Sequence, residues 1–140
     1  MADRDLIEKK LIELKTCIRE LEELKKLSFE EIKSSVHTTW AIEHGLQLAI
    51  QQLIDIGNYI LASTGESRIE NYIDVFDKLG ENNIIPEDFA EGIRGMAGFR
   101  NLLVHEYANV DLMQVYRILQ TKLDNFRQFT KYIKDYLDKI

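Results

Sequence analysis

Apolar residues recur along most of this chain at intervals of three and four, the spacing of one face of an α-helix. The first stripe predicts an amphipathic helix over about residues 4–26, with Glu and Lys on the opposite face. Its apolar members are Ile7, Leu11, Leu14, Ile18 and Leu21. Because an isolated helix of this kind needs tertiary packing, we expect the stripe to face a core, or in part a dimer surface.

A second, longer helix is predicted to begin after Ser28. The segment Ser28-Phe29-Glu30-Glu31 has the pattern of a capping box, in which serine and glutamate satisfy each other's backbone amides. The apolar pattern that follows continues to about Ala62 and contains Gly45 and Gly57. Because an interior glycine costs about 0.5–1 kcal/mol relative to alanine, we expect close helix packing or a bend at each.

A short third helix is predicted between two breaks. Ser63-Thr64-Gly65 ends the long helix, and Ser67-Arg68-Ile69-Glu70 repeats the capping-box pattern. The helix that begins there is expected to reach about Leu79, before a turn at Gly80-Glu81-Asn82-Asn83.

The C-terminal half predicts two more helices. Pro86 suits the first position of a helix whose apolar residues continue to Phe99. Asp111 is the predicted cap of the last helix, whose stripe extends to Leu137. Because short connections favour antiparallel neighbours, we expect an all-α antiparallel bundle of about five helices within one domain, residues 1–140.

Charge limits the partners of such a bundle. The formal net charge is −6, so the chain is not a generic binder of polyanions. Binding to nucleic acid would need a local basic pocket and should be weak and salt-sensitive. The candidates for that pocket are Lys33, Arg68, Arg94 and Arg100.

Cys17 is the only cysteine, which excludes an intrachain disulfide and a metal site built on several cysteines. Its place in a helical pattern favours a small buried hydrophobe over a nucleophile. No stretch approaches the roughly 18 uncharged apolar residues of a membrane span, and the charged N-terminus shows no signal peptide. We therefore expect a cytoplasmic protein with no membrane partner.

No motif for a metal or a cofactor stands out. The chain has no Glu-x-x-His pair, no His-Glu-x-x-His and no P-loop, so we expect neither group. His37 and His44 share a helix face, but two histidines favour structural or solvent roles. The glycine-rich run from Gly92 to Gly98 follows no strand and lies in a helical pattern. It favours a close-packing face over a phosphate cradle.

The segment Arg100-Asn101-Leu102-Leu103-Val104-His105-Glu106-Tyr107 holds the candidate chemistry. Asn101 and His105 are four apart and share a helix face, so the amide can orient the imidazole. Arg100 is five residues from His105, which splays the two by roughly 140° on an ideal helix. They converge if the helix ends near His105, or if a second subunit supplies the complementary group. Tyr107 is expected just beyond, on a loop.

These residue types suit phosphodiester chemistry. A histidine that titrates near neutral pH can take and return a proton. A guanidinium can hold phosphate oxygens and stabilise developing negative charge. In RNA the 2′-hydroxyl can attack the adjacent phosphate without a metal. From spacing alone, however, surface residues at a helix end remain the favoured interpretation.

The same segment resembles the Arg-x4-His-x-Tyr motif of the HepT-like toxins, which belong to the HEPN superfamily. The segments Trp40–Gln47 and Asp55–Asn58 are similar to the family's long second helix, and Gly98–Asn101 is similar to its entry to the motif. The likeness covers most of the chain. After Tyr107, many relatives carry a bulky residue and a glycine, which this chain lacks.

The resemblance implies a homodimeric HEPN-like bundle in which two motif copies line a cleft at the interface. It also implies a metal-independent endoribonuclease toxin of a type VII-like toxin–antitoxin pair, which cleaves RNA by 2′-hydroxyl attack. By position, Arg100 would bind or stabilise the phosphate, His105 would perform acid–base work and Asn101 would support the site. Asp55 would flank the cleft, or is simply a helix-surface acid.

The resemblance further implies a regulator. The partner would be a minimal nucleotidyltransferase of the MntA type, which silences the toxin by adding AMP to Tyr107 and forming O-AMP-tyrosine. Two alternatives remain open: a non-catalytic nucleotide- or partner-binding subunit of such a nucleotidyltransferase, and a purely structural helical dimer.

Overall fold

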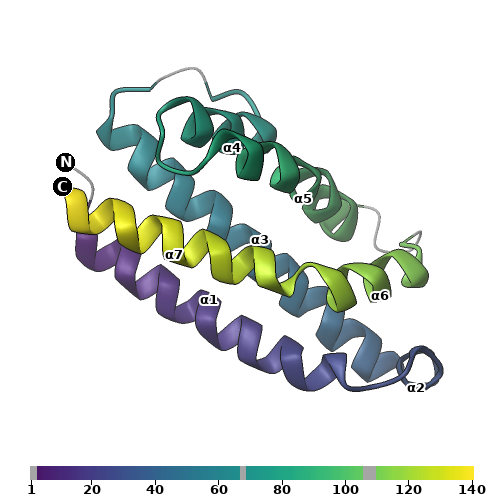
Figure 1. Ribbon diagram of the computed structural model, residues 1–140. Coiled ribbons are helices and arrows are strands. Elements are labelled where there is room, and N and C mark those ends of the chain that lie inside the picture. The colour runs from purple at the N-terminus through teal and green to yellow at the C-terminus, as the bar shows by residue number, and fades with distance from the viewer. Residues whose placement is uncertain (1–2, 67–68, 106–109) are drawn as a thin grey trace.

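The computed structural model describes residues 3–66, 69–105 and 110–140, and these residues form helices and no strand (Figure 1). The central element is the long helix α3, which packs against α1, α4 and α5. Helices α1 and α7 lie side by side on one side of it, and α4 and α5 lie together on the other. In order, the helices are α1 (Arg4–Lys25), α2 (Phe29–Lys33), α3 (Val36–Ser63), α4 (Tyr72–Glu81), α5 (Glu87–His105), α6 (Leu112–Thr121) and α7 (Leu123–Lys139).

Two predicted helices are each divided, so the described residues form seven helices rather than about five. The capping box at Ser28 is confirmed, but it begins only the short helix α2. Ser35 then takes an extended conformation, and its hydroxyl accepts from the Thr38 N–H at 3.2 Å, which starts α3. In the last helix, Lys122 leaves regular helical geometry with φ −112° and separates α6 from α7. Polar capping residues within a continuous apolar pattern account for the first division.

The predicted start of the third helix is wrong. Ser67 and Arg68 lie outside the described residues, and Ile69 and Glu70 are not helical. Instead, Asn71 caps α4: its side chain accepts from the Asp74 N–H at 3.1 Å, and the Asp74 carboxylate accepts from the Asn71 N–H at 3.3 Å. This capping box lies one turn later and competes with the serine pattern.

The starts of α5 and α6 agree closely with the helix starts that the sequence predicts. Pro86 immediately precedes α5, and its carbonyl accepts the first bond of that helix from the Ala90 N–H at 2.9 Å. Asp111 caps α6 by accepting from the Met113 N–H at 3.0 Å. No helix among the described residues is long and apolar enough to cross a membrane.

The core joins apolar side chains from all seven helices. Every member of the first stripe is buried, as predicted, and Phe76, Phe126 and Phe129 are among the largest side chains that are fully enclosed. Cys17 is half-buried and packs against this core. Burial raises the pKa of its thiol, which disfavours the reactive thiolate and agrees with a packing role.

Two glycines of α3 allow neighbouring helices to approach closely. A Cβ on Gly45 would lie 2.9 Å from Leu21 Cδ2, and one on Gly57 would lie 2.5 Å from Val75 Cγ1. The prediction of close packing is therefore confirmed at both positions, against α1 and α4 respectively. The absence of a side chain here offsets the cost that glycine imposes on a helix.

The glycines of α5 behave differently. Gly92, Gly95 and Gly98 are exposed, and a Cβ on any of them would meet nothing within 4 Å. The prediction of a close-packing face is therefore wrong within this chain. Helix α5 thus presents an open strip of backbone on the approach to Arg100, although each glycine costs about 0.5–1 kcal/mol relative to alanine.

Candidate active site

The last two turns of α5 present three of the predicted site residues. Arg100 is half-buried, whereas Asn101 and His105 are exposed, and His105 is the last residue of the helix. Because Arg100 and His105 are both helical, the angular separation of roughly 140° expected for an ideal helix applies. Among the described residues, no hydrogen bond, ion pair or ring contact joins them. Tyr107 lies outside the described residues.

Arg100 is held from three sides. Its Nε donates to Gln51 Oε1 of α3 at 2.9 Å, and its Nη1 donates to Asn101 Oδ1 at 3.2 Å. The guanidinium carbon lies 4.9 Å from the ring centroid of Tyr72 in α4, a cation–π distance. No acceptor among the described residues contacts Nη2, so this amino group is available to a phosphate oxygen.

The contact of Asn101 differs from the expectation. Its side-chain oxygen accepts from Arg100, and no hydrogen bond joins it to His105 within the described parts of the chain. The adjacent guanidinium is a charged donor, and hydrogen bonds from charged donors are the stronger ones. Asn101 consequently supports the arginine of the motif rather than the histidine.

Asp55 is more than an isolated surface acid. Its Oδ1 accepts from Gln51 Nε2 at 2.8 Å, and its Oδ2 lies 3.6 Å from the ammonium nitrogen of Lys10 in α1. Asp55 does not touch Arg100, and Gln51 links the two. The sequence pattern did not single out Gln51, although this residue lies four residues before Asp55 on one helix face.

These residues belong to a longer exposed strip on α3. Its seven members recur at intervals of three or four residues, and none is buried. Trp40 is 64% exposed and Val36 is 59% exposed, which is unusual for such large apolar side chains. We call this the α3 strip: Val36, Trp40, His44, Leu48, Gln51, Asp55 and Tyr59.

Comparison with known proteins identifies the family. Residues 14–133 match the model of the ribonuclease HepT-like family. The chain belongs to the HepT-like ribonucleases. The tRNA nuclease HepT of Aphanizomenon flos-aquae is 32% identical over 122 residues, which cover 85% of this chain and 83% of that protein. The mRNA nuclease HepT of Shewanella oneidensis is 28% identical over 130 residues, which cover 93% and 97%.

A solved structure shares the fold of this HepT-like chain. It is the tri-AMPylated HEPN toxin of Shewanella oneidensis in complex with an MNT antitoxin, with a TM-score of 0.86 and 27% identity. The match covers 95% of this chain and 99% of that one. This shared fold confirms the HEPN-like helical bundle that the sequence predicts.

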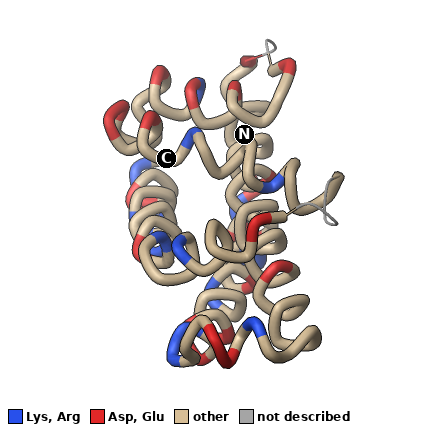
Figure 2. The backbone as a smooth tube through the Cα atoms, turned by 90° about the vertical axis from the view of Figure 1, so that its right-hand side faces the viewer, with Lys and Arg blue, Asp and Glu red and all other residues tan. Residues whose placement is uncertain are grey.

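The predicted basic residues that the structure describes do not form one patch around the motif of this HepT-like ribonuclease. Arg94 makes an ion pair with Asp77 at 2.9 Å, and Lys33 lies in α2, which packs on α3 and α6. Arg68 lies outside the described residues. Figure 2 shows Lys and Arg interspersed with Asp and Glu along the chain. Of the described candidates, neither Arg94 nor Lys33 is therefore placed to support Arg100.

The two other histidines of the chain lie on α3 and do not form a metal site with the described residues. His37 and His44 are both exposed, and the His37 ring packs edge-on against Trp40 with 6.3 Å between centroids. Among the described residues, no three His, Cys, Asp or Glu side chains are grouped as metal ligands.

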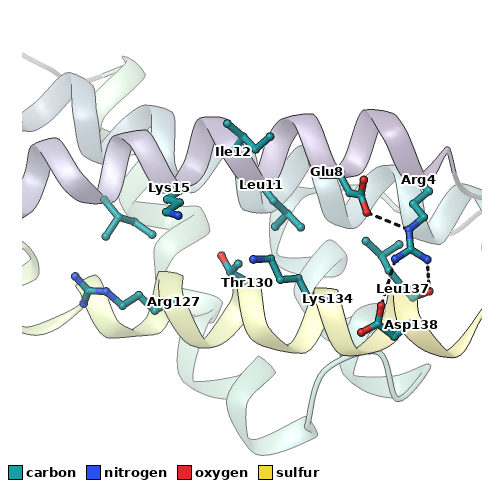
Figure 3. Close-up of a pocket in the computed structure, with 11 residues that line it drawn as sticks. Arg4, Glu8, Leu11, Ile12, Lys15, Arg127, Thr130, Lys134, Leu137 and Asp138 are labelled. Atoms are coloured by element: carbon teal, nitrogen blue, oxygen red, sulfur yellow. Dashed lines mark hydrogen bonds and ion pairs between the residues drawn. The ribbon is translucent and has the colours of Figure 1, made fainter.

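A groove of about 640 Å³ lies between α1 and α7, apart from the motif (Figure 3). At one end Arg4 bridges the helices, donating to Glu8, to Asp138 and to the Leu137 carbonyl. The exposed side chain of Ile12 lies on its rim. None of the described motif residues lines it, so the groove lies apart from Arg100, Asn101 and His105.

Proposed function

We propose that this chain is a metal-independent endoribonuclease toxin in which Arg100 and His105 act on the scissile phosphate of RNA. One observation supports this most directly: Arg100 is held at three points while its Nη2 amino group stays available. A guanidinium fixed in this way is suited to an oxyanion of the transition state. Membership of the ribonuclease family supplies the substrate class.

In the proposed reaction, a base takes the proton of a 2′-hydroxyl, and the freed oxygen attacks the adjacent phosphorus. The bond from phosphorus to the 5′-oxygen breaks, and an acid returns a proton to that oxygen. The products are a 2′,3′-cyclic phosphate and a 5′-hydroxyl. His105 serves as base or acid, while Arg100 stabilises charge on the non-bridging oxygens. Because base and acid act on opposite sides of phosphorus, two imidazoles suit the reaction better than one.

A homodimer would supply the second imidazole. Arg100 and His105 diverge on α5, so one chain does not bring them to a common point. The α3 strip combines exposed apolar residues with the Gln51 and Asp55 contacts beside Arg100. An exposed apolar surface next to a polar site is typical of an interface. We propose that a second copy of the chain covers this strip and completes the cleft.

Cleavage without metal is the first expectation. Purified protein in excess EDTA should cut RNA, and the fragments should carry 5′-hydroxyl ends that a polynucleotide kinase labels without prior dephosphorylation. A requirement for a divalent cation, or 5′-phosphate ends, would contradict the mechanism. No cleavage, together with a tight complex with a neighbouring nucleotidyltransferase, would favour a non-catalytic subunit instead.

We also propose regulation by a minimal nucleotidyltransferase of the MntA type. The related toxin of Shewanella oneidensis carries AMP groups in its complex with an MNT antitoxin. In this chain the acceptor would be Tyr107, two residues after His105. Its phenol oxygen would attack the α-phosphate of ATP and release pyrophosphate. The added phosphate would compete with RNA for Arg100 and repel the RNA backbone.

Mass spectrometry tests this regulation. Incubation with an MntA-type partner and ATP should add AMP to the wild-type chain and abolish RNA cleavage. Tyr107→Phe should accept no AMP, because it lacks the phenol oxygen. Tyr136→Phe is the matched control, since Tyr136 is a partly exposed tyrosine on α7, outside the α3 strip, and this variant should accept AMP normally. AMP incorporation into Tyr107→Phe would rule out this acceptor.

A further inference from the structure

We propose that Gln51 is a positioning residue that presents Arg100 to the RNA phosphate. A chain of contacts fixes it, running from Lys10 in α1 through Asp55 and Gln51 in α3 to Arg100 in α5. The inference rests on the proposed role of Arg100 in phosphate binding. The inference adds Gln51 to the proposed site and explains the orientation of its side-chain amide.

The two neighbours of Gln51 determine which way its amide points. A carboxylate can only accept hydrogen bonds, so Asp55 requires the Nε2 end, which donates to it at 2.8 Å. A guanidinium can only donate, so Arg100 requires the Oε1 end, which accepts from it at 2.9 Å. Both contacts select the same orientation, and a reversed amide would lose both bonds.

Asp55 is itself fixed by charge. The Lys10 ammonium lies 3.6 Å from Asp55 Oδ2 and 3.8 Å from Glu13 Oε2, so α1 offsets the negative charge of α3. The side chains of Lys10 and Asp55 are only 22% and 29% exposed. In such a partly enclosed setting the contacts are less screened than on the open surface.

A neutral acceptor at position 51 has a specific advantage. Glutamine restrains Nε of Arg100 without bringing a negative charge against the guanidinium. A carboxylate in its place would form an ion pair and compete with the phosphate for the same cation. The negative charge is instead carried by the Asp55 carboxylate, which contacts Gln51 and does not touch Arg100. The arrangement orders a long side chain before RNA arrives, which reduces the entropy lost on binding.

Three variants test this positioning role. Gln51→Leu keeps the size of the side chain and removes both polar contacts. It should lower kcat/KM for RNA by about 10- to 100-fold, in line with a lost hydrogen bond to a charged group. The pH profile should stay unchanged, because His105 performs the proton transfer. Gln128→Leu is the matched control: Gln128 is exposed on α7 and hydrogen-bonds to no described residue.

The double variant Gln51→Glu with Asp55→Asn separates positioning from mere support of the fold. An asparagine at 55 can donate to a glutamate at 51, so the hydrogen bonds persist. The negative charge of the carboxylate, however, moves next to Arg100. We expect a wild-type melting temperature and a KM raised by about tenfold. A kcat/KM for Gln51→Leu within twofold of wild type would overturn the positioning role, and wild-type KM and kcat in the double variant would overturn the advantage of a neutral acceptor at position 51.

Arg100→Ala separates the failure of this inference from the failure of the proposed function. If Arg100→Ala is inactive and Gln51→Leu is fully active, only the positioning role of Gln51 is wrong. If Arg100→Ala cleaves RNA normally, the proposed role of Arg100 is wrong, and the role of Gln51 fails with it.

Discussion

Replacing His105 with alanine should reduce RNA cleavage by about 10²- to 10⁴-fold, the usual contribution of a positioned acid or base. An imidazole can both accept and donate a proton, as the proposed acid–base step requires. Cleavage assays with a single labelled RNA in EDTA measure this loss directly.

The fold should survive the change. His105 is exposed at the end of α5 and belongs to no part of the core. Circular dichroism and the melting temperature should therefore match those of wild type. Gln128→Ala is the control for an exposed helical position outside the α3 strip, and it should retain wild-type activity. Full activity of His105→Ala would remove this histidine from the mechanism.

Replacing Trp40 with glutamate should separate the dimer and abolish cleavage together. Trp40 is 64% exposed in one chain and lies on the α3 strip that we propose a second copy covers. A charge buried without a partner at an interface costs several kcal/mol, so the dimer Kd should rise on the order of 100-fold. Sedimentation and cleavage at equal protein concentration measure the two effects.

Ile12→Glu controls for the introduction of a charge at an exposed apolar position. Ile12 is 66% exposed, much like Trp40, but it lies on α1 at the groove against α7 (Figure 3). The Ile12→Glu variant should therefore keep both the proposed dimer and the cleavage activity. A wild-type chain that is monomeric and active would contradict the composite site, as would a Trp40→Glu variant that is monomeric and still active.

Mixed dimers give a sharper version of the same test. Arg100→Ala and His105→Ala are each expected to be inactive. If one site takes Arg100 from one chain and His105 from its partner, a heterodimer contains one intact site. Random mixing would then restore up to roughly a quarter of wild-type activity. No restoration would mean either that both groups of each site come from the same chain, or that one site needs the imidazoles of both chains.

Which segments of the chain form helices was largely predictable, because helix formation depends on local periodicity and capping. The α1 stripe is buried as predicted, and the start of α6 at Asp111 agrees with its capping chemistry. Boundaries were less predictable where two local signals competed. Asn71 and Asp74 form the capping box that starts α4, although the earlier serine pattern is equally regular in the sequence. Hydrogen bonds realised in the fold decide between such patterns.

The sequence by itself determined the helical class, the apolar faces and, through the family motif, the positions of Arg100 and His105. These properties depend on residue type and on spacing along one chain. The tertiary structure alone decided the partner from outside the motif: Gln51 of α3 accepts from Arg100 Nε and so links it to Asp55. Contacts between residues about fifty positions apart depend on how α3 packs against α5, which no local pattern encodes.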